Sequence, residues 1–205
     1  MNKETYLADP CGASSLSFRK TEEIRIPEGM AVLREDQFDP ARHTGRDEPY
    51  FKLIHPLERI PEAELPAGFR PAACSTEEFA RHIRACYAEE GVTAAELEAY
   101  RQQPDYDPDL WIAVSDSCGR IAASGIAGLD TRIGEGVLEW IQVSPEYRRK
   151  GLGRYIVCGL LRRMRGKADF ATVSGRVNSG DNPLALYLSC GFGHPVIWHI
   201  VRDGE

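Results

Sequence analysis

Hydrophobic positions are irregular over the first 65 residues and follow regular patterns over the rest of the chain. The early segment is rich in proline. Its short apolar runs Ile24–Ile26 and Met30–Leu33 flank a Pro-Glu-Gly turn, so we expect these two runs to pair as a hairpin. Tyr50–Ile54 predicts one more short strand. We expect residues 1–65 to form an N-terminal extension that packs on a main domain of residues 66–205.

The main domain begins with a predicted strand and two capped helices. Phe69–Cys74 predicts the strand, and Ser75–Glu78 matches a capping box that would open the first helix. One apolar face of this helix is formed by Phe79, Ile83, Cys86 and Tyr87. Gly91 predicts the end of the helix. Thr93–Glu96 repeats the capping signal, and we expect the second helix to end before Pro104.

Three strands and a long helix are predicted next. Leu110–Val114 and Ile121–Ala127 flank a Ser-Asp-Ser-Cys-Gly turn, so they predict an antiparallel hairpin. Val137–Val143 predicts the third strand. A broad apolar stripe then predicts a helix that packs on the sheet, and it consists of Leu152, Ile156, Val157, Leu160, Leu161 and Met164.

The last part of the chain predicts further strands around one short helix. Phe170–Gly175 predicts a strand, and Asn182 with Pro183 predicts the start of the helix. Trp198–Val201 predicts the final strand. Several hairpin strands together with one parallel crossover indicate a mixed fold, α/β or α+β.

Composition is typical of a soluble globular protein, with 42% hydrophobic and 27% charged residues among 205. No apolar run approaches the roughly 20 residues that span a bilayer, and the first residues contain no apolar signal segment. The six cysteines form no C-x-x-C pair, and the five histidines are equally dispersed. We therefore expect no metal site, no disulfide framework, no membrane partner and a cytoplasmic location.

Charge is unevenly distributed along the chain. The net charge of −6 disfavours nucleic-acid binding, which needs a basic surface. Residues 144–170 nevertheless contain eight Lys or Arg against two Asp or Glu, a balance that suits a phosphate-rich ligand. Residues 75–109 contain nine acidic against three basic residues. This acidic region would attract a cationic amine, or it simply forms a solvated helical face.

The segment Leu138–Arg154 contains an apolar strand, a Pro turn, a basic Gly-x-Gly loop and a helix start. The first turn of a helix has backbone N–H groups without intrahelical partners, and such groups bind phosphate. Gly151 and Gly153 would let a diphosphate approach the backbone closely. Positive charge surrounds the same point, on Arg148, Arg149, Lys150 and Arg154. The segment therefore predicts a phosphate-binding loop.

Two common phosphate-binding motifs do not fit this loop. A P-loop needs a second Gly followed by Lys and Ser or Thr, which does not follow Gly151. A dinucleotide fingerprint needs a third Gly where Ile156 stands. The remaining pattern, V-x-P-x-x-R-x-x-G-x-G over residues 143–153, resembles the acetyl-coenzyme A signature of the GNAT superfamily of N-acetyltransferases. The alternative is an ordinary helix start with Gly for close packing.

A second block, A-L-Y-x-x-x-G-F over residues 185–192, resembles the last motif of the same superfamily. In those enzymes the Tyr of this block, here Tyr187, usually lies near the coenzyme sulfur and can protonate the departing thiolate. The alternative is a core aromatic residue. The superfamily often has an Asn seven residues before the Tyr. That position is Gly180 here, and Asn182 or Asn178 could take over the role.

The resemblance implies a mixed, mostly antiparallel central sheet flanked by helices, here with an N-terminal extension. It also implies that the pantetheine arm of acetyl-coenzyme A lies along residues 141–143 and that the N–H of Val143 polarises the thioester carbonyl. The implied coenzyme-binding residues are Ile141, Gln142, Val143, Arg148, Arg149, Lys150, Gly151, Leu152, Gly153, Arg154 and Asn182.

Glu139 is the candidate general base. It interrupts an apolar strand, and regular alternation would place its side chain on the same face as Ile141 and Val143. GNAT enzymes commonly have a base at this position or two residues earlier, where this chain has Val137. The alternative is a strand-edge Glu paired with a surface Arg.

Taken together, the resemblance implies an acetyl-coenzyme A-dependent N-acetyltransferase, with Glu139 and Tyr187 as catalytic residues. The acetyl group would pass directly to a primary amine of a small molecule or peptide. Two alternatives stay open: a non-catalytic module that senses acyl-coenzyme A or serves as an interaction surface, and transfer of a longer acyl group. Homodimers are common in this superfamily, and the resemblance is compatible with one here.

Overall fold

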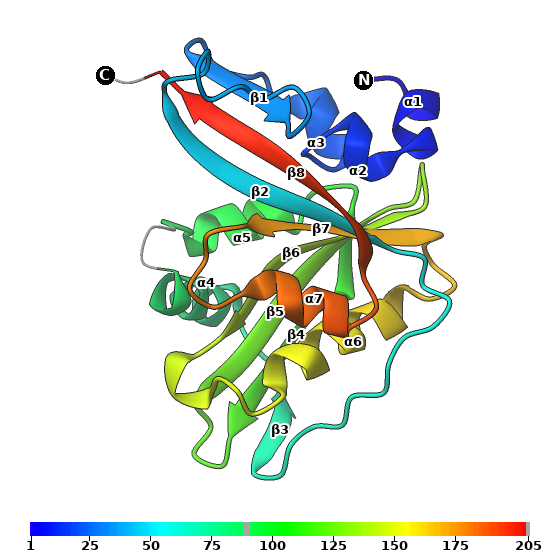
Figure 1. The fold of residues 1–205 in the computed structure, drawn as a ribbon. Helices are drawn as coiled ribbons and strands as arrows, with labels where there is room; N and C mark the ends of the chain where they lie inside the picture. The colour runs from blue at the N-terminus through cyan, green and yellow to red at the C-terminus, as the bar shows by residue number, and fades with distance from the viewer. Residues whose placement is uncertain (88–90, 204–205) are drawn as a thin grey trace. The chain divides into compact units, whose positions relative to one another are not determined.

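The computed structural model describes residues 1–87 and 91–203, which fall into two compact units. The first unit combines residues 1–56 with the chain from Thr172 onward, and the second contains residues 57–171. Eight strands, mostly antiparallel and flanked by helices, confirm the expected mixed α/β fold (Figure 1). Within the described residues, no helix is long and apolar enough to cross a membrane.

The two ends of the chain share a sheet in the first unit. Its strand order is β1-β8-β2-β7, formed by Met30–Arg34 (β1), Gly193–Arg202 (β8), Arg46–His55 (β2) and most of Phe170–Arg176 (β7). Strand β8 runs antiparallel to both β1 and β2, and Figure 1 shows these three strands side by side. The strands predicted at Tyr50–Ile54, Phe170–Gly175 and Trp198–Val201 are confirmed.

The hairpin expected between Ile24–Ile26 and Met30–Leu33 is wrong. Ile24 is the C-cap of helix α3 (Phe18–Glu23), and its side chain is exposed. Strand β1 instead pairs with β8 over all five of its residues. The longer, continuous ladder with β8 satisfies the backbone of β1 better than a three-residue partner could.

A buried lysine holds the chain before α3 against the sheet of the first unit. This part contains α1 (Lys3–Ala8) and α2 (Pro10–Ala13), which are too short to show a helical period in the sequence. Lys52 of β2 is 1% exposed. Its Nζ donates to the Tyr6 hydroxyl at 3.0 Å. It also donates to the carbonyls of Pro10, Ser14 and Leu16 at 2.8, 3.0 and 2.6 Å.

Helix α7 (Pro183–Ser189) begins as the sequence predicts. The Asn182 side chain accepts a hydrogen bond from the N–H of Ala185 at 3.3 Å, and Pro183 occupies the first helical position. Proline fits there because its missing N–H would have no intrahelical partner.

The second unit contains an antiparallel sheet in the order β6-β5-β4-β3. Its strands are β3 (Phe69–Ala72), β4 (Tyr106–Asp116), β5 (Ile121–Asp130) and β6 (Glu135–Val143), as predicted in number and order. Its helices are α4 (Thr76–Cys86), α5 (Ala94–Tyr100) and α6 (Leu152–Met164). Both predicted capping boxes are formed, at Ser75 and at Thr93.

The predicted end of α4 at Gly91 is wrong. The helix ends at Cys86, and Tyr87 is its C-cap in an extended conformation. Tyr87 leaves the helix because its hydroxyl donates to the carbonyl of Ile141 in β6, 2.6 Å away. The remainder of the predicted helix, residues 88–90, lies outside the described residues.

Helices cover both faces of the β6-β5-β4-β3 sheet. Gly125 of β5 has no side chain, which lets Ile156 and Leu160 of α6 pack directly on the strand. The next residue, Ile126, points to the other face. There it packs in a buried cluster with Phe79, Ala80, Ile83, Val92, Leu97 and Ala113, to which α4 and α5 contribute. One face of this sheet is therefore covered by α6, and the other face is covered by α4 and α5.

Candidate functional site

Strand β6 contains a β-bulge where the sequence predicts strict alternation. Ile141 pairs with Gly125, and Leu138 pairs with Ala127. Glu139 and Trp140 of β6 lie between these pairs and therefore oppose a single residue of β5.

The bulge changes the direction of the Glu139 side chain. Leu138 and Ile141 share the α6 face, because their partners on β5 are two residues apart. Glu139, next to Leu138, points to the opposite face, where Trp140 packs against the α4–α5 cluster. The predicted position of Glu139 on the same face as Ile141 and Val143 is therefore wrong.

The end of β6 directs backbone groups away from β5. The N–H of Ser144 donates to the carbonyl of Ala122 at 2.9 Å, so these two residues form a hydrogen-bonded pair. Pairs alternate in an antiparallel ladder, so Val143 and Ile141 belong to non-hydrogen-bonded pairs. Their N–H and C=O groups point toward the other edge of β6. The N–H groups of Ile141 and Val143 therefore do not pair with β5.

Side chains bind both carbonyls of this edge. Tyr87 donates to the carbonyl of Ile141 at 2.6 Å, and Arg148 Nε donates to the carbonyl of Val143 at 3.3 Å. Between them, the side chain of Gln142 is buried and donates to Ser124 at 2.5 Å. These bonds hold the last three residues of β6 in place.

The turn after β6 is fixed by a tyrosine. Pro145–Tyr147 forms one turn of 3-10 helix, and the Tyr147 hydroxyl donates to Asp116 at 2.6 Å. This bond, helped by the backbone and side chain of Arg120, holds the pKa of Asp116 well below its usual range, although burial opposes the shift. The Lys150 ammonium lies 5.3 Å from the centre of the Tyr147 ring. The start of the basic loop is thus anchored to the turn between β4 and β5.

The N-terminus of α6 is open. In the described part of the chain, no side chain caps it, and its first turn contains no acidic residue. Its N-cap, Gly151, has a left-handed backbone with φ of 84°, and Arg149 is also left-handed with φ of 61°. A side chain at Gly151 would meet no described atom closer than Pro66 Cγ at 3.7 Å. There is space beside the first turn of α6, and the helix dipole makes this space attractive to an anion.

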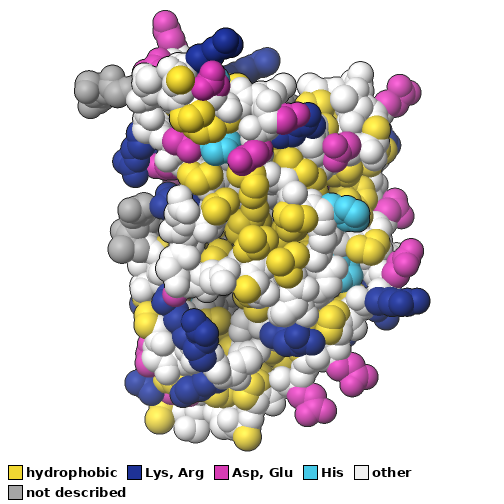
Figure 2. All heavy atoms as spheres, in the orientation of Figure 1, with side chains coloured by type: hydrophobic (Ala, Val, Ile, Leu, Met, Phe, Trp, Pro, Cys, Tyr) yellow, Lys and Arg dark blue, Asp and Glu magenta, His cyan; other side chains and the backbone are white. Residues whose placement is uncertain are grey.

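Basic side chains gather at the same place. Arg149 and Lys150 are exposed, and Arg148 and Arg154 are partly exposed. Figure 2 shows Lys and Arg side chains gathered over the loop that leads into α6. A helix N-terminus with positive charge and space around it is the kind of place where phosphate groups bind in proteins.

Two predicted site residues, Tyr187 and Asn182, lie in the first unit. Tyr187 is 6% exposed and packs edge-on against Phe51 and Phe192, with ring centres 6.1 and 5.7 Å away. Asn182 uses its side chain to cap α7. The second unit brings together Glu139, residues 141–143 and residues 148–154.

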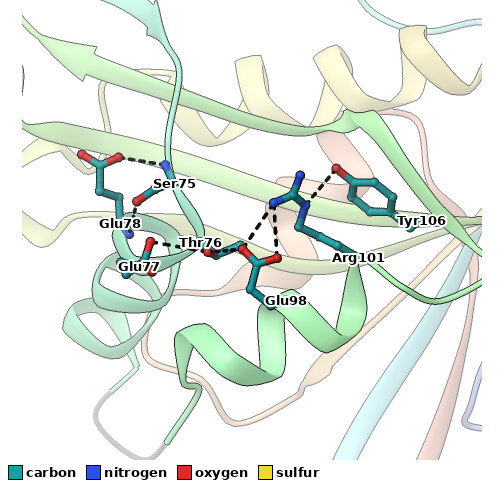
Figure 3. A network of polar contacts seen from close by, with 7 residues as sticks. All are labelled: Ser75, Thr76, Glu77, Glu78, Glu98, Arg101 and Tyr106. Atoms are coloured by element: carbon teal, nitrogen blue, oxygen red, sulfur yellow. Dashed lines mark hydrogen bonds and ion pairs between the residues drawn. The ribbon is translucent and has the colours of Figure 1, made fainter.

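Part of the acidic region 75–109 has a structural role (Figure 3). Thr76 of α4 donates to Glu98 of α5 at 2.7 Å, and Arg101 contacts the same carboxylate at 3.3 Å. Arg101 also donates to the Tyr106 hydroxyl at 3.3 Å. This network joins α4, α5 and the start of β4, so Glu98 already has its cationic partner within the fold.

Sequence reasoning missed Tyr147 and Tyr87 as positioning residues. Tyr147 lies within the matched loop pattern, but Asp116 is 31 positions earlier, and no local spacing reveals their bond. Tyr87 fits the apolar face of α4 and gives no separate signal of its contact with β6. Among the residues that the structure describes, no group of three or more His, Cys, Asp or Glu side chains could hold a metal ion.

Residues 107–194 match the sequence model of the acetyltransferase (GNAT) domain. A comparison with curated proteins gives no match. Among solved structures, the GCN5-related N-acetyltransferase from Sphaerobacter thermophilus is 18% identical with a TM-score of 0.66, over 86% of this chain and 60% of that one. A putative GNAT acetyltransferase from Novosphingobium aromaticivorans is 17% identical with a TM-score of 0.58, over 89% and 71%.

The ribosomal-protein-S18-alanine N-acetyltransferase from Escherichia coli is also similar, at 18% identity and a TM-score of 0.51, over 67% of this chain and 95% of that one. Identities this low show a shared fold, and the chain spans less than two thirds of the Sphaerobacter protein. The matched domain contains β6, the basic loop and α6. Residues 107–194 thus match a GNAT acetyltransferase domain, and the chain shares the fold of solved GNAT acetyltransferases.

Proposed function

We propose that this chain is an acetyl-coenzyme A-dependent N-acetyltransferase that transfers acetyl directly to a primary amine of a small molecule or peptide. One observation carries the proposal. The open N-terminus of α6 follows, after one turn, the end of β6, where the Val143 N–H points away from β5. A single ligand with a diphosphate and a strand-like arm matches this pairing.

The residues of the loop fit the diphosphate of the coenzyme. The N–H groups of Leu152 and Gly153 lie in the first turn of α6, where an α-helix has N–H groups available to an anion. Arg149 and Lys150 are exposed and add positive charge. Arg148 is held against the end of β6 and keeps the loop close to the strand.

The edge of β6 fits the pantetheine arm. The N–H groups of Ile141 and Val143 would hold it as an added strand. When bound, the coenzyme supplies the acetyl group as an activated thioester. We assign the Val143 N–H to the thioester carbonyl, where a fixed donor stabilises developing negative charge.

We assign the role of general base to Glu139. An amine is mostly protonated at neutral pH, so it must lose a proton before it can attack. The bulge turns Glu139 toward the α4–α5 face, and its carboxylate would take that proton, directly or through one water. Tyr187 Oη would donate the proton that the departing sulfur requires.

We assign the acceptor amine to the α4–α5 face, the one to which Glu139 points. Aromatic rings line this side of the sheet: Tyr100 lies 5.8 Å from Trp140 and 6.5 Å from Trp111. Such rings attract ammonium groups by cation–π interaction. The Escherichia coli enzyme named above, whose name gives a peptide amine as its acceptor, has the same fold.

Thiol release from acetyl-coenzyme A with a panel of amines and peptides tests the proposal. We expect Glu139→Gln to lower turnover by about 100-fold or more without changing coenzyme affinity. The matched control is Glu62→Gln, at an exposed position in the connection between β2 and β3. Equal turnover of the two variants would remove Glu139 from the mechanism. Coenzyme binding without thiol release for any amine would favour the acyl-coenzyme A sensor instead.

A further inference from the structure

A buried imidazole connects the two residues that flank Val143. His82 of α4 is 6% exposed, and its Nε2 lies 2.9 Å from the hydroxyl of Ser144. Its Nδ1 lies 2.8 Å from the hydroxyl of Ser124 on β5. The same hydroxyl of Ser124 accepts from the side chain of Gln142 at 2.5 Å. One side chain of α4 is therefore bonded to the residue after Val143 and, through Ser124, to the residue before it.

The direction of the hydrogen bond between His82 and Ser144 follows from the second partner of the Ser144 hydroxyl. The Ser144 hydroxyl donates its single proton to the carbonyl of Ile121 at 3.1 Å, because a carbonyl can only accept. It must therefore accept from His82. The Nε2 atom of His82 carries a proton.

The direction of the hydrogen bond between His82 Nδ1 and the Ser124 hydroxyl is then fixed as well. Burial lowers the pKa of His82 to about 4, against the opposing charge of Glu146, so the ring is neutral at physiological pH. A neutral imidazole has one N–H, so Nδ1 accepts a hydrogen bond from the hydroxyl of Ser124. The bonds run in one direction, from Gln142 through Ser124, His82 and Ser144 to the carbonyl of Ile121.

The direction of these hydrogen bonds excludes a catalytic pair of Cys86 and His82. Cys86 Sγ lies 3.6 Å from Nε2 of His82. Because Nε2 already holds a proton and donates it to Ser144, it cannot take one from the thiol. The imidazole connects parts of the fold rather than activating Cys86.

We propose that His82 is a positioning residue for acetyl transfer, because it fixes the direction of the Val143 N–H. This inference rests on the proposed function, in which that N–H polarises the thioester. The side chains of Ser144 and, through Ser124, of Gln142 are tied to one rigid ring, which restrains the backbone between them and with it the direction of the Val143 N–H. Tyr87, on the same helix end, adds a third tie at the carbonyl of Ile141. Helix α4 thus sets the geometry of residues 141–144.

A donor that is already aimed at the developing charge needs no rearrangement during the reaction. A displacement of about 1 Å can cost on the order of 100-fold in rate. Loss of a bond from His82 should therefore lower kcat more than it weakens coenzyme binding, which the α6 loop provides.

The test compares Ser144→Ala and His82→Phe with Ser115→Ala, a buried serine of β4 outside these bonds. Thermal unfolding verifies that each variant is folded, and Ser144→Ala decides the matter if His82→Phe does not fold. We expect Ser144→Ala to lower kcat by about 10- to 100-fold. The Kd of coenzyme A should stay within about threefold of wild type, since that bond contributes mainly to the transition state.

Nuclear magnetic resonance of the ligand-free protein gives a readout that does not depend on activity. We expect the ¹⁵N shifts of His82 to show a protonated Nε2 and an unprotonated Nδ1. The Val143 amide should exchange with solvent faster in Ser144→Ala than in Ser115→Ala. The opposite tautomer of His82, or equal exchange in both variants, would overturn the proposal.

The kinetic outcomes separate the two levels of inference. A wild-type protein that neither binds coenzyme A nor transfers acetyl would refute the proposed function, and the role of His82 with it. A wild-type protein that does both, while Ser144→Ala is as active as Ser115→Ala, would overturn the role of His82 alone.

Discussion

The hydroxyl of Tyr147 donates a 2.6 Å hydrogen bond to Asp116, and this bond ties the turn before the basic loop to the turn between β4 and β5. Asp116 also accepts from the backbone N–H groups of Cys118 and Arg120, each at 2.9 Å. One carboxylate therefore organises two turns. The loop that leads into α6 starts from a fixed point, which keeps its backbone donors in place before a ligand arrives.

Replacing Tyr147 with Phe should reduce stability in a pH-dependent way. The bond from Tyr147 is the largest cause of the low pKa of Asp116. A carboxyl with a lowered folded pKa stabilises the protein above its unfolded pKa, 3.8, and this contribution is lost as the pH falls. We expect Tyr147→Phe to unfold at lower urea concentration than wild type at pH 7, and the two midpoints to converge toward about pH 2.

Tyr155→Phe, on α6, is the matched control for this series. A difference between Tyr147→Phe and wild type that is the same at every pH would mean that the bond does not act through the ionised Asp116.

Gly151 should resist substitution because of its backbone conformation. With φ of 84°, it occupies the left-handed region, which costs an alanine about 1–2 kcal/mol. We expect Gly151→Ala to lower the free energy of unfolding by about 1 kcal/mol and Gly151→Asn to lower it less, since Asn tolerates this region. Chemical denaturation measures both. A larger loss for Asn than for Ala would show that backbone strain does not decide the identity of this residue.

The sequence predicts local features well and long-range pairings poorly. The capping boxes at Ser75 and Thr93 were predictable because each depends on residues within four positions. The apolar stripe of α6 recurs with the helical period, so the sequence of this segment alone predicts the helix. The loop between Val143 and Gly153 is also local, and it carried the family resemblance.

Other features depend on partners far away in the chain. Met30 of β1 pairs with Arg202 of β8, and nothing near β1 indicates that partner. The bulge at Glu139 shifts a register that strict alternation cannot foresee, so the face of the candidate base was predicted wrongly. His82 gave no signal either, because its bonds to Ser124 and Ser144 span 42 and 62 positions.

Lys52 should be essential to the stability of the first unit. Its buried ammonium donates to three backbone carbonyls and to the Tyr6 hydroxyl. Lys52→Met would leave these oxygens buried without their donor, at a cost of about 3 kcal/mol or more. We expect a lower melting temperature and faster proteolysis of residues 1–17 than in Lys3→Met, an exposed control on α1. Equal melting temperatures would show that water or rearrangement replaces the lysine.

His199 should make stability depend on pH near neutrality. Its ring nitrogens lie 2.9 Å from Asp47 and 3.0 Å from Glu35, and the ring stacks on Phe38 at 3.8 Å. Burial lowers the pKa of His199, but the bonds to the two carboxylates outweigh it and raise the pKa above 6.5. The stabilisation is complete below pH 6.5, the unfolded value, and is lost as the pH rises through the folded pKa.

Urea unfolding between about pH 6 and pH 9 tests this prediction. Wild type should lose its advantage over His199→Gln as the pH rises, whereas His194→Gln, exposed on the same strand, should follow wild type. An advantage that grows with pH would give the opposite sign and refute the ion-pair account.

The central claim is that the open N-terminus of α6 binds the coenzyme diphosphate, and titration calorimetry of acetyl-coenzyme A tests it most directly. Gly153→Glu would place a carboxylate in the first turn of α6, where it favours the helix but repels a phosphate. Gly91→Glu, at an open and exposed position, adds the same charge elsewhere. We predict that wild type and Gly91→Glu bind and that Gly153→Glu does not. Absence of binding to wild type, or equal binding to all three proteins, would contradict the claim.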